Sequence, residues 1–148
     1  MSAQAGVISG REPKTGVNTL TFDNSLGEYD AVAVLKESGW PNPICAVYLR
    51  AGEGYTMTKV PDGTYDIYYM RGRGWDSKEK TFRTMDRMGK IIEPIIMKTD
   101  FSHQVQASYD GLWDVSNTYY SIYTVSFYDD PDDDTSLEEI DPDDFPKI

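Results

Sequence analysis

The chain has 148 residues, of which 39% are hydrophobic, and this length suits a single domain. Eleven tyrosines, five phenylalanines and three tryptophans predict a core built largely from aromatic rings. The formal net charge is −11, no stretch is apolar enough to cross a membrane as a helix, and the first residues lack a signal-peptide pattern. The one cysteine, Cys45, excludes an internal disulfide, and its apolar neighbours predict a buried, inert thiol.

Segments that alternate apolar and polar residues dominate the chain after a flexible leader, which we expect at residues 1–16. The first five predicted strands cover residues 17–23, 29–36, 45–50, 55–60 and 64–70, with a tight turn at Pro61-Asp62-Gly63 before the last. After an Arg/Gly run come residues 78–83, a looser segment at 84–90, and an edge or bulged strand at 91–99 around Pro94. A short strand at 103–109, a turn at 110–117 and a strong strand at 119–128 complete the pattern.

Helical periodicity is not sustained anywhere in the chain. Seven to nine short strands separated by turns predict an all-β fold, an antiparallel β-sandwich spanning residues 17–128. Residues 129–148 follow it as an acidic tail that is disordered or loosely docked. The residues available for docking are its apolar ones, namely Leu137, Ile140, Phe145 and Ile148.

The tail carries most of the negative charge, because its eight Asp, two Glu and one Lys give −9 of the total −11. Its first part holds the acidic residues Asp129, Asp130, Asp132, Asp133 and Asp134. Their spacing does not follow that of an EF-hand loop, so we expect a solvated tail with at most weak, non-specific calcium binding and no dedicated metal site.

A basic segment lies at residues 71–90, where seven basic residues stand against three acidic ones. The candidate interaction residues are Arg71, Arg73, Trp75, Lys78, Lys80 and Arg83. We interpret the run Arg71-Gly72-Arg73-Gly74 as a protruding loop that docks a carboxylate-rich segment, either the tail of the same molecule or that of a neighbour. Nucleic acid is not the expected partner, because the −9 tail competes for the same cations.

Catalytic signatures are absent from the sequence, which contains no G-x-S-x-G, H-E-x-x-H or C-x-x-C motif. The lone histidine, His103, is interpreted as a surface or strand-end residue. A pair of carboxylates such as Asp66 and Asp76 would be needed for glycoside cleavage, but the sequence does not show their separation. We therefore assign no catalytic residue and no cofactor, and we expect a protein that is not an enzyme.

Two resemblances involve these residues. The stretch YTMTKVPDGTYDI resembles the strand–turn–strand signature of prealbumin-like sandwiches such as carboxypeptidase regulatory-like domains. The stretches NTLTFDNSLGEYDAVAVLK, AVYLRAGEGYTMTKVPDGTYDIYYMRGRGWDSKEKTFR and YSIYTVSFY, with EEIDPDDFP near the end, are similar to a group of uncharacterised bacterial proteins. In that group an all-β domain follows an N-terminal membrane or zinc-ribbon segment, and we expect this chain to depart from the group because no membrane segment is seen before Asn18. The resemblance implies the fold and supplies no activity.

Together these features favour an interaction or structural module that binds a protein partner or itself through sheet edges and charged termini, with a homo-oligomer as one form. A carbohydrate-binding module and a small hydrolase using His103 or paired acids stay open as alternatives. Tyrosines expected to point outward, which would suit recognition, are Tyr68, Tyr119, Tyr120 and Tyr128. The compartment is not fixed by the sequence, and a cytoplasmic, extracellular or virion-type assembly is compatible with it.

Overall fold

The computed structural model describes the backbone of residues 6–91, 94–108, 111–127 and 137–148, and the side chains of the same residues except 100–108, 111–119 and 137. Nearly all regular structure in these ranges is β-strand, and a 3₁₀ helix, η1 (Pro142–Asp144), lies near the C-terminus. The predicted all-β sandwich is confirmed, although the described residues form twelve strands rather than seven to nine.

The larger sheet of the body has seven strands. Its order is β1 (Gly6–Gly10), β4 (Cys45–Leu49), β3 (Asp30–Glu37), β6 (Gly63–Asp76), β7 (Thr81–Ile91) and β12 (Leu137–Glu139), with β8 (Ile95–Met97) beside the start of β6. Neighbouring strands in it run antiparallel. The central strands β3 and β4 are buried along nearly their whole length because both faces of the sheet are covered.

The smaller sheet packs on one face of the larger one and has three strands, in the order β11 (Ile122–Ser126), β2 (Asn18–Asn24) and β5 (Glu53–Val60). Strand β2 runs antiparallel to β5 and parallel to β11. The main core lies between the two sheets. It contains residues that are spaced by two along their strands, such as Leu20 and Phe22 of β2 and Ile67 and Tyr69 of β6, all fully buried.

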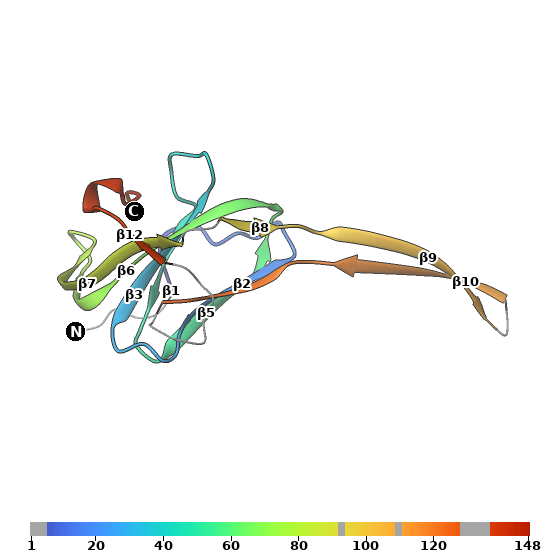
Figure 1. Ribbon diagram of the computed structural model, residues 1–148, viewed down its shortest axis with the longest axis horizontal. Helices are drawn as coiled ribbons and strands as arrows, with labels where there is room; N and C mark the ends of the chain where they lie inside the picture. Colours follow the sequence, from blue (N-terminus) through green and yellow to red (C-terminus); the bar gives the residue numbers. More distant parts are fainter. Residues whose placement is uncertain (1–5, 92–93, 109–110, 128–136) are drawn as a thin grey trace.

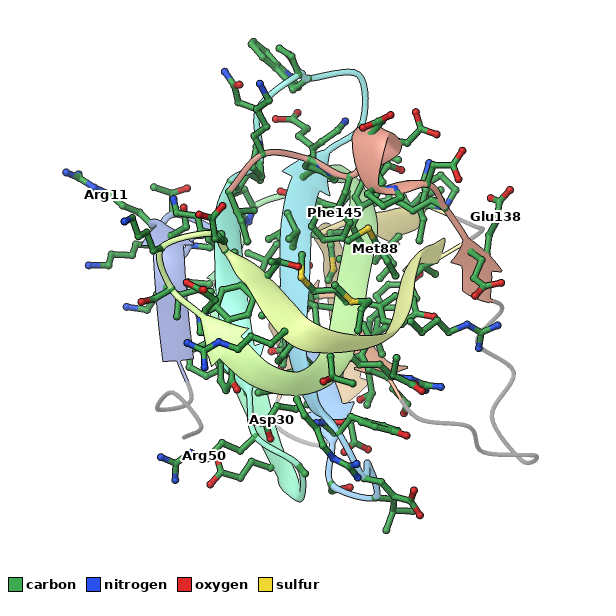
Figure 2. The ribbon with its side chains drawn as sticks, turned by 90° about the vertical axis from the view of Figure 1, so that its left-hand side faces the viewer. Arg11, Asp30, Arg50, Met88, Glu138 and Phe145 are labelled. Carbon is green, nitrogen blue, oxygen red and sulfur yellow. The ribbon has the colours of Figure 1, made fainter. Side chains whose placement is uncertain are left out.

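The opposite face of the larger sheet, here called the outer face, is also apolar. Its buried cluster consists of Val32, Val34, Ala46, Tyr48, Met70 and Phe82. The β6–β7 hairpin curls over this face, as Figure 2 shows, so that the rings of Trp75 and Phe82 lie 5.7 and 6.1 Å from that of Tyr48. The curl requires glycine at position 72, where a Cβ would lie 2.2 Å from the carbonyl oxygen of Thr84.

Several local predictions differ from the structure, and the strand predicted at 119–128 is one of them, because Tyr119 ends one strand and β11 begins at Ile122. Within the leader expected at residues 1–16, Gly6–Gly10 form β1 and pair with β4. The turn predicted at 110–117 is wrong, because Gly111–Tyr119 form strand β10, which pairs with β9 (Asp100–Ser108). The loop predicted at residues 71–74 is also wrong: β6 continues to Asp76 and the chain turns at residues 77–80. Gly72 there permits a close approach of β7 after a shift in register, not a reversal of the chain.

Candidate interaction site

A two-stranded hairpin, formed by β9 and β10 and here called the arm, extends from the body and belongs to neither sheet (Figure 1). Its strands pair antiparallel without interruption, from Asp100 opposite Tyr119 at the base to Ser108 opposite Gly111 at the tip. Nine residues at about 3.3 Å each give an arm of about 30 Å. Each strand has a strand neighbour on one side only, so both outer backbone edges of the arm are unpaired within the described part of the chain.

The arm continues strands of both body sheets. Strand β9 follows β8, which belongs to the larger sheet, after two residues. Strand β10 leads through Tyr120 and Ser121 into β11, which belongs to the smaller sheet. The arm therefore starts where the two layers of the sandwich meet, and its direction is tied to both layers.

A polar cluster at the base, here called the root cluster (Asn18, Asp62, Lys98, Thr99 and Ser121), holds the two strands of the arm to the body. The fully buried Asn18 donates from Nδ2 to Asp62 Oδ1 at 2.9 Å, and its Oδ1 accepts from the backbone N–H of Ser121 at 2.9 Å. Thr99 Oγ1 donates to the same Asp62 oxygen at 2.6 Å. Ser121 Oγ accepts from the Lys98 N–H at 2.9 Å and lies 3.1 Å from the Lys98 carbonyl oxygen, to which it donates.

The carboxylate of Asp62 is the charged centre of the root cluster. Hydrogen bonds from Thr99 and then from Asn18 lower its pKa below the usual value, because they stabilise the ionised form. Asp62 comes from the Pro61-Asp62-Gly63 turn between β5 and β6, so a turn that joins the two sheets also fixes the base of the arm.

The predicted interaction residues are not gathered on one surface. Arg71 pairs with Asp86, with Nε 2.5 Å from Oδ2, and donates from Nη1 to the carbonyl oxygen of Phe127 at 3.3 Å. The guanidinium of Arg73 lies over the ring of Tyr29, 4.7 Å from its centroid. These two arginines, in the C-terminal half of β6, therefore contact groups of their own chain.

The other four residues lie around the curled end of the hairpin. Trp75 packs with the outer-face cluster, 5.1 Å from the ring of Phe82, and is half-buried. Lys78 and Lys80 belong to the turn at 77–80, where Asp76 accepts from two backbone N–H groups, and Arg83 is exposed at the start of β7. Lys80 Nζ donates to the carbonyl oxygen of Ile148 at 2.7 Å, and this hydrogen bond joins the turn to the tail.

The last part of the tail lies on the outer face of the larger sheet. Leu137–Glu139 pair antiparallel with the end of β7, and the N–H of Ile140 donates to the carbonyl oxygen of Met88 at 3.2 Å. Phe145 and Ile148 pack against the outer-face cluster, and Figure 2 shows Phe145 above Met88 on this face. The predicted acidic residues 129–134 lie outside the described residues.

The residues considered for catalysis have separate surroundings. Asp66 is buried on the outer face, accepts from Ser38 Oγ at 3.0 Å and lies 3.8 Å from Lys36 Nζ, whereas Asp76 caps the 77–80 turn at the other end of β6. The backbone of His103 lies in β9 opposite Ser116, not at a strand end, and its side chain is outside the described ones. Among the described side chains, no three His, Cys, Asp or Glu residues come together as a metal site. No helix in the described ranges is long and apolar enough to span a membrane.

The structure describes the side chains of Cys45 and of two of the four tyrosines that were expected to point outward. The thiol of Cys45 is buried, as predicted, and burial followed by the negative charge of Glu12 raises its pKa to about 11. Tyr120 is half exposed, as expected of an outward residue. Tyr68 differs from the prediction because Phe145 of the tail covers it, and the side chains of Tyr119 and Tyr128 lie outside the described ones.

Sequence reasoning missed the arm, although one signal pointed to it. The dipeptide Asp110-Gly111 is a strong hairpin signal when alternating segments flank it on both sides. We interpreted Gly111 and the residues after it as a turn, when they are the returning strand. Comparison with known proteins adds no further site, because no family model, no curated protein and no solved structure matches the chain. The resemblances described above therefore stay predictions.

Proposed function

We propose that the protein is a non-catalytic structural module that joins copies of itself by adding strands along the arm. The observation that carries the proposal is the arm, a long hairpin whose two outer edges have no strand neighbour in the described part of the chain. An isolated two-stranded hairpin is only marginally stable in water, and three or more strands are needed for a stable sheet. A partner strand at either edge would supply the missing hydrogen bonds.

The arm lacks the features that normally prevent strand addition, which are lysines, prolines, bulges and short length. Residues 100–119 contain no Lys, Arg or Pro, their acidic residues are Asp100, Asp110 and Asp114, and the register of β9 with β10 has no bulge. Three edge strands of the body do carry such features. Strand β12 has only three residues, β1 is interrupted by a register shift, and β5 contains Lys59. The arm is thus an edge that the sequence leaves open to a partner.

A second copy is the partner that fits this edge best. When a strand pairs antiparallel with the same strand of another molecule, a two-fold axis relates the two copies and each contact occurs twice. The root cluster supports such pairing, because an arm held in one direction loses less conformational freedom on binding than a loose one.

The experiment compares the size of the intact protein with that of a variant carrying Gln104→Lys and Gln106→Lys on β9. We expect the intact chain to be larger than a monomer at high concentration and the variant to be monomeric, because charges on an edge strand oppose pairing. The matched control carries Thr56→Lys and Thr58→Lys on exposed positions of β5, which adds the same charge away from the arm. A monomeric intact protein, or loss of assembly in the control as well, would contradict the proposal.

A further inference from the structure

The outer face of the larger sheet has the features of a peptide-binding groove. Its floor is the buried cluster around Tyr48 and Met70, and one wall is the curled β6–β7 hairpin. Two hollows, of about 480 and 530 Å³, lie between the hairpin and residues 137–148, here called the C-terminal segment. The segment therefore leaves part of the groove open.

The C-terminal segment makes the kinds of contact that bound peptides make. It adds a three-residue strand to the edge of β7, places Phe145 edge-on against Tyr68, and accepts a hydrogen bond from Lys80 at the far end. The charges match in part, since the segment has five acidic residues and one lysine, and the two hollows beside it are lined by Lys78, Lys80 and Arg87 together with Glu79 and Asp86. None of these contacts depends on the connection of the segment to the same chain.

We propose that this groove is a binding site for the C-terminal segment and that a second copy of the chain can supply it. Identical chains offer identical segments, and residues 128–136 separate the segment from the last core strand. Exchange is then a competition between two sources of one ligand. The segment of the same chain has a high effective concentration and occupies the groove in dilute protein, while copies brought together by other contacts exchange segments. The exchange rests on the proposed self-assembly only for bringing copies close, because the groove itself is independent of the arm.

The first test uses a fluorescent peptide of residues 137–148 and a full-length acceptor carrying Phe145→Ala and Ile148→Ala, so that its own segment binds weakly. The acceptor and the protein with the natural segment, here still called the wild type, both carry Gln104→Lys and Gln106→Lys in addition. These two substitutions separate this site from pairing through the arm. We expect saturable binding of the peptide to the acceptor and at least about tenfold weaker binding to the wild type, whose groove is filled. A peptide with alanine in place of Phe145 is the control and should bind the acceptor at least about tenfold more weakly.

The second test mixes this acceptor with a donor that keeps its segment but carries Tyr68→Ala and Lys80→Glu in the groove. A mixed complex that neither variant forms alone supports exchange between copies. If the peptide does not bind an acceptor that retains its β-sheet circular dichroism, the groove is not a binding site for the segment. Lack of peptide binding to an acceptor that carries Phe145→Ala alone has the same meaning. Peptide binding without a mixed complex overturns the second copy as its source. Neither result depends on whether the arm assembles the protein.

Discussion

The ring of Phe145 lies edge-on against the ring of Tyr68, with centroids 6.0 Å apart and planes inclined at 75°. The two residues are far apart in the sequence, and their contact joins the end of the chain to a central strand of the larger sheet. Tyr68 belongs to β6 and would otherwise present its ring to water on the outer face. The contact therefore shows that part of an acidic tail contributes to the apolar packing of the fold.

Replacing Phe145 with alanine should lower the free energy of unfolding by about 1–3 kcal/mol, which is below the value for a fully buried ring because Phe145 is half-buried. Urea unfolding followed by tryptophan fluorescence measures the change. The neighbouring exposed Asp144→Ala is the control and should change stability by less than about 0.5 kcal/mol. Equal stability of Phe145→Ala and the wild type would mean that the tail contact does not stabilise the body.

Replacing Gly72 with alanine should destabilise the protein by about 1–3 kcal/mol or more, because the new Cβ would lie 2.2 Å from the Thr84 carbonyl oxygen and 2.9 Å from the Phe82 side chain. Thermal unfolding by circular dichroism measures the loss. Arg73→Ala, one residue further on, removes the contact with Tyr29 and should cost about 0.5–1 kcal/mol. A Gly72→Ala protein as stable as the wild type would refute the close crossing of β6 and β7.

The root cluster should make the protein sensitive to acid. The pKa of Asp62 is lowered in the fold, so its contribution to stability is complete above the ordinary Asp value of 3.8 and is lost as the pH falls through the lower folded value. We expect the wild type to lose more stability than Asp62→Asn between about pH 4 and pH 2, because the amide does not titrate. Denaturant midpoints measured across this range test it. Parallel pH curves for the two proteins would contradict the role of the Asp62 carboxylate.

Cys45 should react slowly with thiol reagents in the folded protein. Its side chain is buried, and its pKa of about 11 leaves very little thiolate at pH 8. We expect labelling with a disulfide reagent to become complete only after unfolding in denaturant. Rapid labelling of the native protein at pH 8 would show that strand β4 opens readily or that the thiol is more accessible than its position indicates.

The sequence predicts the body of the fold well, because strands with one or two buried faces carry a clear apolar pattern. Tyr65, Ile67 and Tyr69 share the inner face of β6, as their spacing of two predicts. The sequence predicts the structure of the Arg/Gly run poorly, because glycine is typical of turns, whereas Gly72 is needed here for a close approach between strands. The pairing of β9 with β10 was missed because the turn signal was placed on the wrong residues.

The candidate site was harder to predict than the fold. The arm depends on strand continuity between two sheets, and its root cluster joins Asn18 to Ser121 across 103 residues of sequence. No local pattern reports a contact of that range. The tail was different, because its few apolar residues, among them Phe145 and Ile148, were predicted to dock, and these two lie against the outer face.

Hydrogen–deuterium exchange along the arm tests strand addition most directly. In dilute protein, amides of β9 and β10 that point to the outer edges have no strand partner and should exchange rapidly. At high concentration these amides should become protected in alternate positions along the strand, while the amides between β9 and β10 change little. Exchange at the outer edges that is the same at all concentrations would contradict assembly through the arm.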